Sequence, residues 1–282
     1  MQRLRQGQRS ALYIPVLLLS AIFCRAAEVA EKTGDAAAAG PAQSSPAAAP
    51  SLALSPGVVE VKARPGVSTT HALTMSNLTG TRLRFVMEAF DVVVRDGKRV
   101  FIPAGETAGG IARSAVFDPA AIELDSGARG EVKVTLTVPA DPKVRAVVAI
   151  FRGQTVLHAQ GAVMFTGSLG ALITYNLSPD VRVKAGGPTV TPQTDNRNLV
   201  VAEQLENDGE EPAIPKGTLA ILRSSGELVG RVIIQPHRLL PGEKFECTVE
   251  YPHTLRSGKY RAMMSIQHEG GVQSSGLDFQ VE

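Results

Sequence analysis

Residues 129–138 read RGEVKVTLTV, and their pattern is the clearest indication of the fold class. Apolar residues occupy every second position and polar residues the positions between them: Val132, Val134, Leu136 and Val138 against Lys133, Thr135 and Thr137. Successive side chains of an extended strand point to opposite faces, so this alternation predicts a strand with one buried face.

Similar stretches follow one another along residues 57–282, separated by Gly, Pro, Asn and Asp, and none has a helical period. Asp96-Gly97 joins two of them, which is a strong hairpin signal. The alternation of Phe245, Cys247 and Val249 predicts that the Cys247 thiol is buried. The spacing is that of β-sandwiches, and we expect one over residues 57–177 and a second over residues 178–282.

The residues before these strands differ in composition. Residues 1–26 combine Arg3, Arg5 and Arg9 with an apolar run that is shorter than the roughly 20 residues of a spanning helix, which predicts a signal peptide. The leader is expected to be cleaved near Ala26 or retained as an anchor. Residues 27–56 hold 11 alanines and 4 prolines, which predicts a disordered linker that tethers the sandwiches.

The charge of the chain excludes one class of partner. Four of the 29 basic residues lie in the leader, so 25 remain against 27 acidic residues. A net charge near −2 does not indicate binding to nucleic acid or to anionic lipid. We therefore expect an exported protein, periplasmic or extracellular, without nucleic-acid binding and without a transmembrane span in the mature chain.

The sequence offers no constellation for catalysis, metal binding or cofactor binding. The five histidines are scattered singly, and Cys247 has no second cysteine beside it once the leader is removed. The glycine-rich stretch 105–110 lacks the Lys and Ser/Thr of a phosphate loop. We expect no cofactor and a protein that binds rather than catalyses.

Two groups of turn residues carry a resemblance. In residues 239–262, Leu-Leu-Pro-Gly-Glu precedes a strand and Ser-Gly-Lys-Tyr-Arg-Ala follows it, which resembles the end of a bacterial immunoglobulin-like sandwich with a tyrosine corner at Tyr260. Ala63-Arg64-Pro65-Gly66, Met75-Ser76-Asn77-Leu78-Thr79 and Thr137-Val138-Pro139 are similar to elements of the amino-terminal domain of periplasmic, PapD-like pilus chaperones. The order of domains also resembles that of WxL-interacting cell-wall proteins. The resemblance implies an all-β protein of two tandem immunoglobulin-like β-sandwich domains.

The chaperone resemblance further implies two basic residues, from the first and last strands of domain 1, that hold a carboxylate of the partner. Lys62 or Arg64 fits the first role. Residues 162–177, the expected last strand, contain no Lys or Arg, so the second role has no candidate.

The same last strand is the candidate interaction edge. Residues 161–175 carry no charge and include Val163, Phe165, Leu169 and Leu172. Two interpretations stay open: a strand covered within the fold, or a free edge that pairs with a partner strand.

Two functions follow as expectations. The first is a non-enzymatic binding or scaffold protein of the cell envelope, which engages another envelope or secreted protein, or the cell wall, through sandwich edges and loops. The alternative is a periplasmic pilus-type assembly chaperone that donates a strand to secreted subunits.

Overall fold

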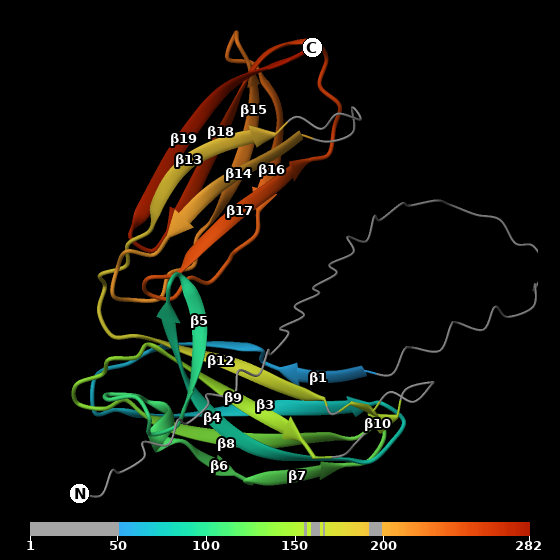
Figure 1. Cartoon of the computed structure of the whole chain (residues 1–282), viewed down its shortest axis with the longest axis vertical. Helices are drawn as coiled ribbons and strands as arrows, with labels where there is room; N and C mark the ends of the chain where they lie inside the picture. Colours follow the sequence, from blue (N-terminus) through green and yellow to red (C-terminus); the bar gives the residue numbers. More distant parts are fainter. Residues whose placement is uncertain (1–50, 155–156, 159–163, 166, 192–198) are drawn as a thin grey trace, which may run out of the picture. The chain divides into compact units, whose positions relative to one another are not determined.

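The alternating stretches form mostly antiparallel strands that build two β-sandwiches, as the fold-class prediction states (Figure 1). The computed structural model describes residues 51–154, 157–158, 164–165, 167–191 and 199–282. Residues 48–282 belong to one compact unit. The predicted signal peptide and the predicted linker up to residue 50 lie outside the described residues.

The first sandwich has one sheet in the order β1-β3-β8-β6. Its strands are β1 (Ser51–Ser55), β3 (Ser68–Leu78), β8 (Arg129–Thr137) and β6 (Val116–Asp118). Strand β8 contains the alternating stretch predicted as a strand, and its alternate residues Val132, Val134 and Leu136 are fully buried. The predicted period of two is confirmed.

The second sheet of this sandwich has the order β2-β12-β9-β4-β5, with β7 also paired to β4. Its strands are β2 (Val58–Lys62), β12 (Ser168–Asn176), β9 (Ala146–Gly153), β4 (Leu83–Arg95), β5 (Lys98–Pro103) and β7 (Ala121–Leu124). A short 3-10 helix covers Ala112–Ser114, and β10 (Leu157–His158) pairs with β11 (Met164–Phe165). Asp96 and Gly97 both have positive φ, which makes the predicted β4–β5 hairpin turn.

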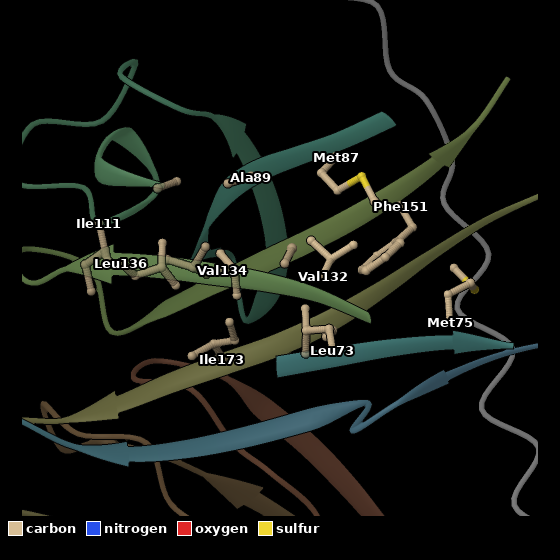
Figure 2. Packing of buried hydrophobic residues seen from close by; sticks show 14 of the residues in the cluster. Leu73, Met75, Met87, Ala89, Ile111, Val132, Val134, Leu136, Phe151 and Ile173 are labelled. Carbon is tan, nitrogen blue, oxygen red and sulfur yellow. The ribbon is translucent and has the colours of Figure 1, made fainter. Parts of the chain in front are cut away.

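The core of the first sandwich lies between these sheets, as Figure 2 shows. Leu73 and Met75 from β3 and Val134 from β8 face Phe151 from β9 and Ile173 from β12. Burial of such side chains contributes roughly 1.5–3 kcal/mol each to folding. The core therefore fixes which face of each strand remains outside.

The predicted linker is wrong at its carboxyl end. It extends to residue 56, whereas Ser51–Ser55 form β1 and pair with β3. Leu52 and Leu54 alternate with small residues of the types Ser and Ala and pack against the core. Beyond Pro56 the chain changes sheets, because β2 pairs with β12.

The second sandwich packs the sheet β13-β14-β17 against the sheet β16-β15-β18-β19. Its strands are β13 (Lys184–Thr191), β14 (Leu199–Glu206), β17 (Lys244–Tyr251), β16 (Leu228–Ile234), β15 (Lys216–Arg223), β18 (Gly258–His268) and β19 (Gly271–Val281). Cys247 is buried among them, as predicted. The Tyr260 hydroxyl donates to the Arg256 carbonyl at 2.7 Å, which is the expected tyrosine corner.

Candidate functional site

Strand β12 is the last strand of the first sandwich and lies between β9 and β2. It pairs antiparallel with β9 from Ser168 to Thr174. It pairs parallel with β2 only from Leu172 to Asn176. Residues 168–171 therefore have a strand partner on the β9 side alone, within the described part of the chain.

The register shows which backbone groups face the open side. The Tyr175 amide donates to the carbonyl of Arg145, the residue before β9, and the Gly153 amide of β9 donates to the Gly167 carbonyl. In an antiparallel pair, alternate residues bond the same neighbour, so the amides and carbonyls of Ser168 and Gly170 point away from β9. Neither residue has a backbone partner on that side among the described residues.

Strand β1 runs beside this open edge without pairing to it. Its hydrogen bonds go to β3. The Leu52 side chain comes within 3.1 Å of the position that a Cβ of Gly167 would occupy. Leu52 of the opposite sheet therefore lies against the residue that precedes β12.

The face of this sheet that points away from the core is apolar, and we call it the outer face. It carries Val92, Ala146 and Val148, which are buried, and five half-buried apolar residues: Phe90, Val94, Phe101, Ile150 and Leu172. Leu172 lies opposite Val148 and Val148 opposite Phe90, so these three form one row across the sheet. Arg152 and Glu88 form a bidentate ion pair at one side of the face.

The four edge residues expected from the sequence do not share one surface. Val163 lies outside the described residues, and Phe165 pairs with Leu157 in the β10–β11 hairpin. Leu169 points inward and packs against the core, whereas Leu172 lies on the outer face. An odd and an even position of one strand necessarily point to opposite faces.

The two basic candidates lie near the end of β2. Lys62 is exposed and stands opposite Asn176 of β12, and Arg64, at the following turn, is exposed as well. Neither side chain forms a hydrogen bond or ion pair with another described residue. The Asn176 side-chain amide donates to the Pro212 carbonyl at 2.9 Å.

Sequence reasoning missed the contacts that the second sandwich makes with the outer face. Residues 237–243, which we call the docking segment, provide them. Leu240 is 2% exposed and packs on Val92, Ala146 and Val148. The pattern Leu-Leu-Pro-Gly-Glu indicated a turn but not what the turn contacts.

Charged groups flank the Leu240 contact on both sides. The Arg99 Nε lies 2.9 Å from Glu243 Oε1, and Arg99 Nη2 donates to the Arg238 carbonyl at 2.6 Å. The Arg238 guanidinium donates to Thr174 Oγ1 at 2.6 Å and to the Glu60 carboxylate. Arg238 thus joins the second sandwich to both β2 and β12.

A cleft of about 660 Å³ adjoins these contacts. Val92, Arg145, Leu177, Glu211 and Leu240 contribute to its lining. Arg145 Nε lies 3.2 Å from Glu211 Oε1, and the Leu177 amide donates to Glu211 Oε2 at 2.9 Å. Because Glu211 is only 1% exposed, this ion pair is largely removed from water.

The described residues include no cluster of three or more His, Cys, Asp or Glu that could hold a metal ion. Burial, with a smaller contribution from Glu203, raises the pKa of the Cys247 thiol to about 11, which opposes thiolate formation. The described residues also contain no helix of the length and apolarity needed to span a membrane.

No family model matches the sequence, and no curated protein matches it. Solved structures do match this chain. The Class 5 fimbriae chaperone CfaA is 13% identical, with 82% of this chain and 99% of that chain covered and a TM-score of 0.40. The E. coli chaperone DraB is 16% identical, with coverage of 83% and 98% and a TM-score of 0.36. A chain of the CsuC–CsuE chaperone–tip adhesion subunit complex of Acinetobacter baumannii is 11% identical, with coverage of 81% and 97% and a TM-score of 0.39. The chain is thus similar to fimbrial chaperones over nearly their whole length, at low identity.

Proposed function

We propose that this protein is an exported, non-enzymatic binding protein of the cell envelope that captures a partner polypeptide as an added strand. The observation that carries the proposal is the open edge of β12. The amides and carbonyls of Ser168 and Gly170 point away from β9 and have no strand opposite them among the described residues. Main-chain bonds to such an edge supply affinity, and neighbouring side chains supply specificity.

The outer face supports this proposal because it continues from the open edge. Leu172 and Ile150 are half-buried apolar residues that stand beside Gly170. Alternate side chains of an added strand would extend this face, and each apolar contact of this kind gains roughly 25 cal/mol per Å² removed from water. The partner is accordingly an envelope or secreted protein with an apolar strand.

One substitution tests the edge without touching the core. Ser168→Pro removes an amide that points to the open side, whereas Ser168→Ala keeps it. A photo-reactive residue in place of Leu172 reports contact in an envelope extract, and the same residue in place of the exposed Thr70, on the other sheet, is the control. We expect adducts with an exported protein from position 172 only, and their loss with Ser168→Pro. Adducts that are equal from both positions, or indifferent to Ser168→Pro, contradict the proposal.

An assembly chaperone that donates a strand to secreted subunits is the second candidate. The observation that favours it is that the open edge and Lys62 lie on neighbouring strands, so one partner chain could reach both. In that case the adduct is a soluble complex with one subunit, and Lys62→Gln lowers its yield. A scaffold attached to the cell wall would instead sediment with the wall fraction and be indifferent to Lys62→Gln.

A further inference from the structure

The sheet β16-β15-β18-β19 of the second sandwich ends in two edge strands, each with a strand partner on one side only among the described residues. β16 pairs with β15, and β19 pairs with β18. Four exposed, large apolar side chains of the described chain lie on these two edges: Leu228, Ile233, Val272 and Leu277. Because proteins normally protect open edges with charge or proline, two edges with so little protection call for an explanation.

The register of β15 shows which backbone groups of β16 face the open side. Alternate residues of a strand bond to opposite neighbours in an antiparallel sheet. The Ser224 amide, just after β15, donates to the Lys259 carbonyl of β18, so the odd-numbered residues of β15 face β16. One of them lies opposite Val232. The amides and carbonyls of Arg231 and Ile233, on either side of Val232, therefore point to the open edge.

The backbone of β19 has the same phase at the other edge of the sheet. Odd-numbered residues of β18 bond to β15, so its even-numbered residues bond to β19, and one of these lies opposite Leu277. The amides and carbonyls of Gly276 and Asp278 therefore point to the open side. The side chains of Gln273 and Ser275 bond to the opposite sheet of the sandwich.

Each of these two strands carries one charged residue, and the two charges are opposite. Arg231 is exposed on β16, and the three residues that follow it across the sheet are uncharged. Asp278 is exposed on β19, where its Oδ1 lies 3.8 Å from Arg261 Nη1 in a pair whose side chains are both more than half exposed. Exposed ion pairs of this kind are weak, so Asp278 can still pair with a cation on an added strand.

We propose that the second sandwich binds another copy of this chain, with β16 of one copy beside β19 of the next. Neighbouring strands of this sheet are antiparallel, so a copy in the same orientation adds its β19 antiparallel to β16. Aligning Arg231 with Asp278 of the second copy brings together residues whose backbone groups both face the junction. The side chains of this pair lie on the same face of the joined sheet, where opposite charges across two strands attract.

The apolar side chains fit the same register. Ile233 is 69% exposed and would lie opposite Gly276 of the second copy, which has no side chain to oppose it. Leu277 is 39% exposed and would lie opposite Val232, on the inner side of the sheet. The contact joins two different edges of the molecule, so it repeats from copy to copy and does not close into a symmetric pair.

Sedimentation equilibrium of the full chain over a series of concentrations tests the inference. The average mass should rise with concentration. Arg231→Glu and Asp278→Arg should each weaken the association about tenfold, because a favourable cross-strand pair becomes a like-charged one. An equimolar mixture of the two variants should associate as the wild type does, since every contact of an alternating assembly again joins opposite charges. This recovery also requires both variants to be folded.

Two control variants separate this junction from other surfaces. Lys259→Glu makes the same change of charge at an exposed position on an inner strand of the sheet, and should leave the association unchanged. Ser168→Pro, at the β12 edge, should also leave it unchanged. A wild type that stays monomeric at every concentration, a mixture that does not recover, or an equal loss with Lys259→Glu overturns the inference. These measurements involve no other protein, so their outcome is independent of the capture proposed at β12.

Discussion

At the scale of single residues, polar side chains buried inside the sandwiches hold the neighbouring backbone in place through hydrogen bonds. Asp91 is fully buried at the inner face of β4, and its Oδ1 accepts the amides of Ile111 and Ala112, each at 2.9 Å. This fixes the loop that precedes the short 3-10 helix. Its Oδ2 has no partner among the described residues.

The Asp91 carboxylate, with one oxygen bonded and the other without a partner among the described residues, leads to a prediction about stability. Burial raises its pKa, against the opposing effect of the two amides. Above the pKa of Asp91 in the folded state, the charged carboxylate therefore destabilises the fold. This destabilisation is absent below the pKa of Asp91 in the unfolded chain. Asp91→Asn should be more stable than the wild type at pH 7 and lose that advantage as the pH falls toward 4, whereas Asp91→Ala should cost about 2–3 kcal/mol at pH 7 because two buried amides lose their acceptor. Urea unfolding at several pH values measures both, and equal stabilities of Asp91→Asn and wild type at pH 7 would contradict the assignment.

Cys247 is a second residue whose environment sets its chemistry. It lies inward on β17 at 3% exposure, opposite Glu203 of β14. With a pKa of about 11 and no access for reagent, the thiol should react with Ellman's reagent at pH 8 only as fast as the protein unfolds. Leu228→Cys, made at a half-exposed position of the same sandwich, should react within the mixing time. Fast labelling of Cys247 in native buffer would show that the strand phase is misassigned.

At the scale of elements, each sandwich contains a corner of the same kind, held by a buried asparagine. Asn77 in the first sandwich and Asn207 in the second are both fully buried. The Asn77 side-chain amide donates to the Leu124 carbonyl, and the Asn207 side-chain amide donates to the Leu239 carbonyl. Each backbone carbonyl also accepts the amide of a positive-φ glycine, Gly127 or Gly242. The Asn-Leu-Thr sequence at residues 77–79 is thus a structural turn in which the amide nitrogen is already bonded.

This corner should matter more than its position in a loop suggests. Asn207→Ala removes the bonds to the Glu211 and Leu239 carbonyls and the acceptor for the Gly209 amide. The free energy of unfolding should fall by about 2–4 kcal/mol, because buried polar groups lose their partners. Asp208→Ala, at the exposed next residue, should change it by less than about 0.5 kcal/mol. Similar values for the two variants in urea unfolding would refute a shared structural corner.

The elements also show how far the sequence predicts this fold. Alternation predicts β8 and β17 directly, because their buried residues recur every second position. The sequence does not indicate β1 as a strand, because Leu52 and Leu54 stand among Ala, Ser and Pro, a composition that is typical of linkers. The open edge of β12 depends on how far β2 extends beside it, and the contacts of Arg238 with Glu60 and Thr174 join residues that are distant in sequence. No local pattern encodes such contacts.

At the scale of the whole molecule, the contact between the sandwiches combines an apolar centre with charged flanks. Leu240 provides the centre, and the Arg99–Glu243 and Arg145–Glu211 pairs flank it. The Lys244 amide also donates to the Gly97 carbonyl at the tip of the β4–β5 hairpin. Sandwiches joined only by a linker would move independently, whereas these contacts couple their unfolding.

The strength of that coupling can be measured through Leu240, because its side chain belongs to the second sandwich but is buried against the first. Leu240→Ala should leave both cores intact and weaken the coupling by about 2–4 kcal/mol, the usual cost of emptying a buried leucine site. Calorimetry should then resolve two unfolding transitions where the wild type shows one. Leu228→Ala, at a half-exposed position of β16, is the control and should keep a single transition. If Leu240→Ala instead lowers one undivided transition, Leu240 supports a single cooperative core, and the sandwiches do not separate before they unfold.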